Sequence, residues 1–487
     1  MSCLHFTISR VCAALLFLAA LSAQADIAWK PCELTPPGSV VGVKAQCGTF
    51  DVPENRNESA GRMIELRLAK IPARANDPAP DPVVFLAGGP GQSATESYPQ
   101  VAAAFHGLLA DRDVILVDQR GTGGSHPLRC SLPDATDPTE PLPDRDDLQH
   151  LARECLVELE QTSDVTHYTT RDYLVDLEAV REALNIERWN LIGGSYGTRV
   201  ALSYIQAYPA RVRSAVLDGV VPQDIALGQD HGANLDAALE AQFDRCRKNV
   251  ACAAAFGDPS RTLDELRRRY REAPTTVIIP DPRSYQPIEM ALNHETLAGT
   301  VRLYAYSPET IALLPLLLHR AQEGDPQPLL AQAHMIFGEL EDLLAHGMQL
   351  SVACSEDAPW LTSVPNDTSL IGPELTGLLQ AQCEVWPVRP APAAFKQPVD
   401  SDIPVLLLSG EFDPVTPPAY AERALTTLSN ARHLVAPGQG HIVQTRGCMP
   451  KLIERFIADA NVDDLDAACL RTLVPPPFYL DFNGSAP

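Results

Sequence analysis

One five-residue run constrains the fold of this chain more than any other feature of its sequence. The run is Gly193-Gly194-Ser195-Tyr196-Gly197, which follows an apolar segment at 189–192 and opens a helix-forming stretch. A short apolar segment that ends in glycine indicates a buried strand. Only small neighbours fit at so tight a strand–turn–helix junction, and the turn forces the serine side chain out over the edge of the sheet. The run therefore indicates a strand that passes directly into a helix, as in a layered α/β sheet.

Apolar segments of the same kind recur along the chain, with helical stretches between them. The expected strands are 63–69, 83–87, 114–117, 189–192, 212–217, 405–408 and 433–436, and the clearest expected helices are 172–184 and 195–208. Continuous apolar strands that alternate with helices predict an α/β fold with a mostly parallel, buried central sheet.

The alternation stops after Asp218 and resumes only at Ile403. The segment between them carries amphipathic helical patterns around 234–247 and 262–271. We therefore predict an inserted, mainly helical cap at 225–395. The core of the fold is then divided into an N-terminal part at 26–224 and a C-terminal part at 396–487.

The first 25 residues have the pattern of a secretory signal peptide. Arg10 supplies a positive charge, an apolar run extends from Val11 to Leu21, and Ala23-Gln24-Ala25 forms a small-residue cleavage site. This run is too short to cross a bilayer, which needs about 20 residues. We expect an exported protein, periplasmic or secreted, with no membrane span once residues 1–25 are removed. The formal net charge of −24 argues against nucleic acid as a partner, because phosphates are repelled by such a surface.

Cysteine usage agrees with export. Of twelve cysteines, Cys3 and Cys12 lie in the predicted signal, which leaves ten. An even number in an exported chain suggests disulfides rather than metal ligands, and no CxxC pair or zinc-like spacing is present. Short loop closure favours neighbours along the chain, although the sequence alone does not fix the connectivity. The expected bridges are Cys32–Cys47, Cys130–Cys155, Cys246–Cys252, Cys354–Cys383 and Cys448–Cys469.

Three residues have the order and context of a catalytic triad. A serine hydroxyl needs a base to take its proton, and the base needs an orienting acid. After Ser195, the loop that follows strand 405–408 carries Asp413, and the loop that follows strand 433–436 carries His441. In this kind of fold the acid and the histidine follow the serine in that order. Two alternatives stay open: Asp413 could serve only as a turn residue before Pro414, and Glu411 could be the acid.

A second requirement of acyl transfer is a pair of backbone N–H groups for the developing oxyanion. Gly88-Gly89-Pro90-Gly91 follows the expected strand 83–87, where this fold supplies one donor, and the residue after the serine, Tyr196, supplies the other. Gly89 is the first choice from the glycine turn and Gly88 the second. A plain tight loop is the alternative reading of the G-G-P-G run.

These motifs resemble those of the prolyl iminopeptidases and tripeptidyl aminopeptidases of the α/β-hydrolase fold. The most specific shared motif is Asp118-Gln119-Arg120-Gly121-Thr122-Gly123-Gly124-Ser125, alongside the G-G-P-G turn, the serine run and Asp413-Pro414-Val415-Thr416-Pro417. The export signal, the cysteines and the C-terminal part are similar to the secreted tripeptidyl aminopeptidase branch. Ala87 departs from the family pattern, since prolyl iminopeptidases usually have a histidine there, which puts strict proline specificity in doubt.

The resemblance implies an α/β-hydrolase with a cap that releases N-terminal residues or short peptides. It also implies acidic cap residues that hold the substrate's free amino group, for which Glu356 and Asp357 are the best placed, unless both are surface residues of a disulfide-linked loop. A carboxylic ester hydrolase is the alternative function, and a non-catalytic binding module on the same fold is a more remote one. No metal or organic cofactor is implied, the substrate is a peptide or small ester, and the oligomeric state is not predicted.

Overall fold

The computed structural model describes residues 27–485 except 40, 59, 131–143, 282–283, 363–366 and 373. The predicted signal peptide, 1–25, lies outside the described residues. Among the helices that are described, none combines the length and apolar character that a membrane crossing needs.

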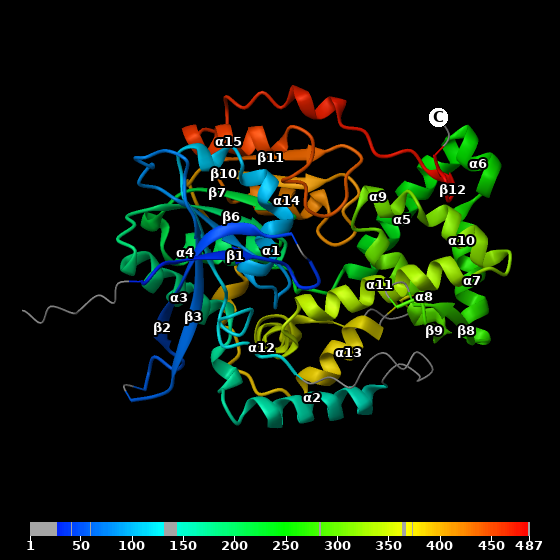
Figure 1. Cartoon of the computed structure of the whole chain (residues 1–487), viewed down its shortest axis with the longest axis horizontal. Helices are drawn as coiled ribbons and strands as arrows, with labels where there is room; N and C mark the ends of the chain where they lie inside the picture. The colour runs from blue at the N-terminus through cyan, green and yellow to red at the C-terminus, as the bar shows by residue number, and fades with distance from the viewer. Residues whose placement is uncertain are drawn as a thin grey trace, which may run out of the picture.

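A nine-stranded sheet forms the larger of two regions (Figure 1). In spatial order its strands are β1 (Lys30–Leu34), β2 (Val43–Pro53), β3 (Met63–Ile71), β5 (Val114–Val117), β4 (Val83–Leu86), β6 (Trp189–Gly194), β7 (Val212–Asp218), β10 (Val405–Gly410) and β11 (Ala431–Ala436). The pairs β1–β2, β2–β3 and β3–β5 are antiparallel, and every pair from β5 to β11 is parallel. The prediction of a mostly parallel central sheet is confirmed.

Helices cover both faces of this sheet, because alternate residues of each strand point to opposite sides. On β4, Val84 and Leu86 belong to one apolar cluster, whereas Val83 and Phe85 belong to the other. The first cluster includes residues of α2 (Arg145–Leu159), α3 (Thr170–Ala183), α4 (Tyr196–Ala207) and α14 (Pro418–Leu425). The second includes residues of α1 (Ala94–Val101) and α15 (Met449–Asp459). The result is a three-layered α/β/α core.

The chain between β7 and β10 contains the second region, which lies to one side of the sheet (Figure 1). Its elements are α5 (His231–Lys248), α6 (Val250–Phe256), α7 (Pro259–Glu272), β8 (Thr275–Pro280), β9 (Pro287–Leu292), α8 (His294–Tyr304), α9 (Pro308–Ile311), α10 (Leu314–Gln322) and α11 (Gln327–Leu343). Residues such as Phe243, Leu266 and Val301 give these elements an apolar cluster of their own. The hairpin formed by β8 and β9 is a strand pair that the helical patterns did not predict.

Two further helices follow in the inserted segment, α12 (His346–Glu356) and α13 (Glu374–Cys383). Met348 and Val352 of α12, together with Trp386, pack in the cluster on one face of the central sheet and not in the separate cluster. The predicted cap, 225–395, therefore contains two parts: one with its own apolar cluster, and one, which includes α12, that packs on the central sheet.

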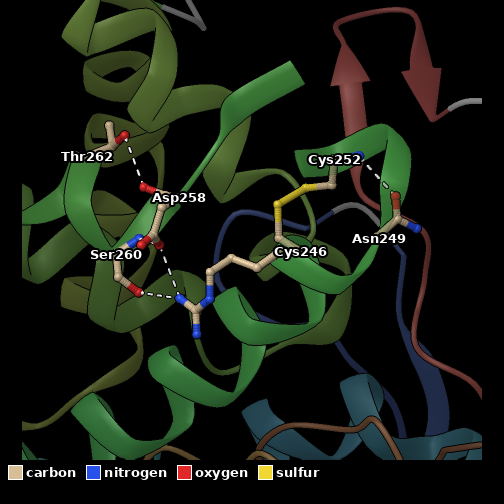
Figure 2. The surroundings of a disulfide bond; sticks show 7 residues. Cys246, Asn249, Cys252, Asp258, Ser260 and Thr262 are labelled. Carbon is tan, nitrogen blue, oxygen red and sulfur yellow. Dashed lines mark hydrogen bonds and ion pairs between the residues drawn. A yellow bond between two sulfur atoms is a disulfide. The ribbon is translucent and has the colours of Figure 1, made fainter. Parts of the chain in front are cut away.

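All five disulfides join the neighbours that the sequence predicted: Cys32–Cys47, Cys130–Cys155, Cys246–Cys252, Cys354–Cys383 and Cys448–Cys469. Figure 2 shows the bridge that links α5 to α6, beside the Asn249 side chain, which accepts a hydrogen bond from the N–H of Cys252 at 2.9 Å.

The C-terminal segment crosses from the core to the second region (Figure 1). It ends in the small hairpin β12 (Tyr479–Asp481) and β13 (Gly484–Ser485). Phe478 packs in a cluster with the Cys246–Cys252 bridge and Leu316, and the N–H of Tyr479 donates to the carbonyl of Ala312 at 3.1 Å. The tail of the chain is therefore part of the packing of the inserted region.

Candidate active site

Ser195 occupies the turn between β6 and α4. Its backbone has φ of 53° and ψ of −122°, a conformation that non-glycine residues rarely adopt, and its N–H donates to the carbonyl of Asp218 at 2.8 Å. A Cβ on Gly193 would lie 2.4 Å from the carbonyl oxygen of Gly197, and one on Gly197 would lie 2.2 Å from that of Leu86. Glycine is therefore required on both sides of the serine, which explains the run that the sequence displays.

Asp413 and His441 meet at the ends of two neighbouring parallel strands. Asp413 follows β10, His441 follows β11, and His441 Nδ1 lies 2.8 Å from Asp413 Oδ2. The buried carboxylate also accepts the N–H groups of Val415 and Thr416 and the hydroxyl of Thr416, each at 2.8 Å. These bonds fix the orientation of the carboxylate. They also hold the acid in place to orient the imidazole.

The other carboxylate that the sequence offered as the acid, Glu411, has a different partner. Its Oε2 accepts the N–H of Gly438 at 2.7 Å, in the turn that leads to His441. Glu411 therefore supports the backbone of the histidine loop, and the imidazole is bonded to Asp413.

Two opposing effects act on the pKa of His441. Burial lowers it, but the charge and hydrogen bond of Asp413, with a smaller contribution from Asp218, outweigh burial and raise the pKa above its usual value of 6.5. An imidazole with this pKa is a stronger base towards a serine hydroxyl than an isolated histidine, provided that the pH keeps it neutral.

Asp218, at the end of β7, connects the serine turn to the histidine loop. Its carbonyl binds the N–H of Ser195, and its carboxylate accepts the N–H groups of Val443, at 3.0 and 2.9 Å, and Gln444, at 2.8 Å. Burial raises the pKa of this carboxyl to about 6. We did not predict this role from the sequence, although a carboxylate directly after a buried apolar strand is a signal that could have indicated it.

Close backbone packing brings the serine and histidine sides together. A Cβ on Gly219 would lie 2.9 Å from His441 Cε1, and one on Gly194 would lie 3.5 Å from Ile442 Cδ1. The residues that follow Asp218 and precede Ser195 thus contact the loop of His441. The serine turn and the histidine loop are therefore in contact at the edge of the sheet.

The G-G-P-G turn lies beside the serine. A Cβ on Gly88 would be 3.3 Å from Ser195 Cβ, and Gly89 has φ of 105°, a conformation that favours glycine. The N–H groups of Gly89 and Tyr196 donate no hydrogen bond to any residue that the structure describes. These two donors are therefore free to receive a substrate oxygen, as the predicted oxyanion role of Gly89 and Tyr196 requires.

The D-Q-R-G-x-G-x-S motif holds in place the residues that follow this turn. The Asp118 carboxylate accepts the hydroxyl of Ser93 and both the N–H and the hydroxyl of Thr95, just after the G-G-P-G run, together with the N–H of Gly124. Arg120 forms a fully buried, two-pronged ion pair with Asp176. The motif therefore positions the turn, and these two residues form bonds within the scaffold.

Glu356 and Asp357, the predicted amino-group site, point to different partners. Glu356 is fully buried; its two oxygens accept the N–H and the hydroxyl of Thr170, each at 2.8 Å, and the Thr170 hydroxyl lies 2.6 Å from the Tyr196 hydroxyl. Burial, with a smaller effect from Asp357, raises the pKa of Glu356 to about 7. Asp357 is bound by Arg199 at 2.8 Å and by Lys396 at 2.7 Å.

The consequence is that neither carboxylate is open towards a substrate in this structure. Glu356 has no exposed surface and is bonded to Thr170, and Asp357 is already paired with two cations. Glu356 is linked through Thr170 to Tyr196, the residue next to the serine, so its evident contact is with the scaffold of the site. Amino-group binding by this pair stays a prediction.

The inserted region contributes Tyr306 to the site. Its carbonyl accepts the N–H of His441 at 2.8 Å, and its ring meets the imidazole edge-on with centroids 5.3 Å apart. No motif marks Tyr306, because its role depends on how the insertion folds over the sheet edge. In the part of the chain that is described, no group of three or more His, Cys, Asp or Glu side chains could hold a metal ion.

Comparison with known proteins gives the family to which this fold and site belong. Residues 81–447 match the family described as alpha/beta hydrolase fold, so the chain is a member of the α/β-hydrolase family.

Among curated relatives, the chain is similar to the serine protease Hip1 of Mycobacterium tuberculosis, with 25% identity over 91% of this chain and 91% of the relative. It is 23% identical to a tripeptidyl aminopeptidase of Streptomyces lividans over 94% of this chain and 89% of the relative. A proline iminopeptidase of Neisseria gonorrhoeae is 32% identical over 28% of this chain and 32% of the relative. The solved structure of a proline iminopeptidase from Mycobacterium smegmatis is 17% identical, with a TM-score of 0.40, over 84% of this chain and 98% of that one.

Proposed function

We propose that this chain is an exported serine hydrolase that releases N-terminal residues or short peptides from peptide substrates. The observation that carries the proposal is the Asp413–His441 hydrogen bond beside Ser195 in its strained turn. The peptidase reaction is supported by relatives named as a serine protease and as a tripeptidyl aminopeptidase, which match nearly the whole chain.

The proposed reaction proceeds through an acyl-enzyme. Ser195 Oγ attacks the scissile carbonyl while His441 Nε2 takes its proton, and the negative oxygen that forms accepts the N–H groups of Gly89 and Tyr196. His441 then gives the proton to the leaving nitrogen as the C–N bond breaks. Water, deprotonated by the same imidazole, attacks the ester, and Ser195 recovers its proton when the product acid leaves. Asp413 holds the imidazole in the required tautomer throughout.

We further propose that residues 225–395 act as a cap that selects substrates. The contact of Tyr306 with His441 supports this role, since it brings the insertion next to the reacting groups. Export to the periplasm or beyond is supported by the five disulfides, because such bonds persist in oxidising compartments.

A carboxylic ester hydrolase is the second candidate, and one observation favours it. The carboxylates of Glu356 and Asp357 are bonded to other protein groups, so neither is available to bind the amino group of a substrate. The same triad cleaves esters without needing such a group.

A substrate panel tests both candidates. It contains aminoacyl, dipeptidyl and tripeptidyl nitroanilides, each with a free and an acetylated N-terminus, beside short-chain nitrophenyl esters. We expect the free-amine peptides to give the highest kcat/KM. Equal turnover of free and acetylated peptides, with esters cleaved faster than both, would contradict the peptidase proposal and support the esterase.

A further inference from the structure

The C-terminal end of α8 forms the wall beside the candidate catalytic histidine. Besides the contact of the Tyr306 ring with His441, the backbone approaches so closely that a Cβ on Gly440 would lie 2.3 Å from the Tyr306 carbonyl oxygen. The turn does not end at Tyr304, because the N–H of Tyr306 still donates to the carbonyl of Leu303 at 3.3 Å. Ala305 and Tyr306, at the end of this turn, therefore contact the loop of His441.

Arg302 belongs to this turn, four residues before Tyr306. Its side chain is half-buried, and its guanidinium forms no hydrogen bond or ion pair with any residue that the structure describes. The more deeply buried arginines of the core differ: Arg120 is paired with Asp176 and Arg199 with Asp357. A cation that is partly withdrawn from water without a counter-charge is unfavourable, and it gains most from an anion brought to it.

His231, the first residue of α5, connects Arg302 to the catalytic pair. Its Nδ1 is enclosed and has no hydrogen-bond partner among the described residues. Burial lowers the pKa of His231 to about 3, and the next largest cause is the charge of Arg302, followed by that of His441 and then Asp413, which acts in the opposite direction. His231 is thus near both Arg302 and the triad, and it is uncharged at neutral pH. Three residues further along α5, the Asn234 side chain donates to the carbonyl of Val415 at 3.2 Å, so the start of this helix lies against the loop of Asp413.

We propose that Arg302, assisted by His231, is a carboxylate-binding subsite for the leaving group of the substrate. The side of the site follows from the chemistry, since the imidazole that protonates the leaving nitrogen must face the leaving group. Arg302 lies on the side of His441, whereas the acyl group is held by Ser195 and the N–H groups of Gly89 and Tyr196. The inference rests on the proposed function and narrows it.

The substrate class that fits is a short peptide whose free C-terminal carboxylate lies one or two residues beyond the scissile bond. A guanidinium binds a carboxylate through two parallel hydrogen bonds, which makes the recognition directional as well as charged. A longer peptide, or one that ends in an amide, brings no carboxylate to this position.

Matched pairs of short peptides test the subsite, each pair identical except for a C-terminal carboxylate or carboxamide. A charge-assisted hydrogen bond corresponds to about 10- to 100-fold in kcat/KM, so we expect the native enzyme to prefer the carboxylate by that factor. Arg302→Met should reduce the preference to about onefold by lowering turnover of the carboxylate form only. Arg302→Lys should restore part of the preference for the carboxylate, because a lysine keeps the positive charge but cannot form two parallel hydrogen bonds.

Arg268→Met is the control, since Arg268 is an exposed arginine of the neighbouring helix α7. It removes the same charge from the same region and should leave the preference intact. Unchanged thermal unfolding of Arg302→Met shows that the variant is folded, and unchanged turnover of carboxamides shows that its triad is intact.

Equal turnover of the two forms by the native enzyme would overturn the subsite, and so would a preference that survives in Arg302→Met. If no peptide is cleaved, the proposed peptidase function fails, and esters then decide the subsite separately. Esters whose leaving alcohol carries a carboxylate would be compared with uncharged esters of the same size. An Arg302-dependent preference for the charged ester supports the subsite, and its absence overturns it.

Discussion

The sheet edge and the inserted cap differ in how their polar groups are satisfied. At the sheet edge, Asp413 and Asp218 are buried and each accepts several N–H groups from loops that follow the strands. In the cap, Arg302 is half-buried without a partner among the described residues. On our proposal, the difference teaches that the groups for bond cleavage are arranged before substrate arrives, whereas Arg302 leaves an interaction for the substrate to complete.

The largest effect is expected at the sheet edge. Ser195→Ala should lower kcat by about 10⁴- to 10⁶-fold, because loss of the nucleophile removes the acyl-enzyme route. Turnover of peptides and esters is the measurement, with thermal unfolding as the check on folding. An organophosphonate should label the native protein at Ser195 and fail to label the variant. Labelling that persists in the variant would mean that the nucleophile is elsewhere.

The next test concerns the acid limb of the pH profile. Only neutral His441 can accept the serine proton, so kcat/KM should fall as the pH drops through its pKa. Because Asp413 raises that pKa, the midpoint should lie above 6.5 in the native enzyme. Asp413→Asn should lower kcat by about 10⁴-fold, since the imidazole loses the partner that fixes its tautomer.

Asp218 requires a control in the same experiment, because burial raises its pKa to about 6, close to the range of the limb. Asp218→Asn removes that titration. The fall of kcat/KM at low pH should then follow the protonation of a single group, His441. A profile that stays flat down to about pH 5 in the native enzyme would contradict the role of His441 as the base.

A smaller effect is expected at Glu356, a residue of the inserted segment that is bonded to Thr170 of the core. Glu356→Gln keeps the shape of the side chain but turns one acceptor towards the Thr170 hydroxyl into a donor. We expect kcat/KM to fall about 10-fold, equally for free-amine peptides, acetylated peptides and esters, because the altered contact leads to Tyr196 and not to the substrate. A loss confined to free-amine peptides would establish Glu356 as the amino-group site instead.

The smallest effect on turnover is expected at the bridge between α5 and α6. Replacing Cys246 and Cys252 together by serine opens a short loop, and chain entropy gives a loss of about 2 kcal/mol in the free energy of unfolding. Denaturant unfolding measures this loss. Activity should change less than about twofold, since a change away from the site acts mainly on stability. A large loss of kcat with stability unchanged would show that this bridge acts on the site.

Much of the sheet could be predicted from sequence, because parallel strands buried on both faces are continuous apolar runs. The 114–117 and 405–408 segments are of this kind, and they became β5 and β10. The strand β1, at one edge of the sheet, and its neighbour β2 were missed, since their residues are mostly exposed or half-exposed and show no such run. The triad candidates could be found because each follows a strand directly and their loops meet at one sheet edge.

The cap contacts could not be predicted, because they depend on tertiary packing alone. Glu356 and Asp357 are adjacent in sequence, which suggested a joint site, but successive residues at the end of a helix point in different directions. One meets Thr170 and the other meets Arg199 and Lys396. Tyr306 carries no motif, and its place beside His441 appears only once the insertion is folded against the edge of the sheet.

The C-terminal segment has a mechanical consequence for this arrangement. An inserted region joined to its host only by the two ends of the insertion can swing about them as a hinge. Here Phe478 and Tyr479 add a further attachment, remote from those ends, through the cluster beside the Cys246–Cys252 bridge and the carbonyl of Ala312. An attachment away from the two ends opposes such a motion. The contact of Tyr306 with His441 is thereby braced from the far side of the insertion.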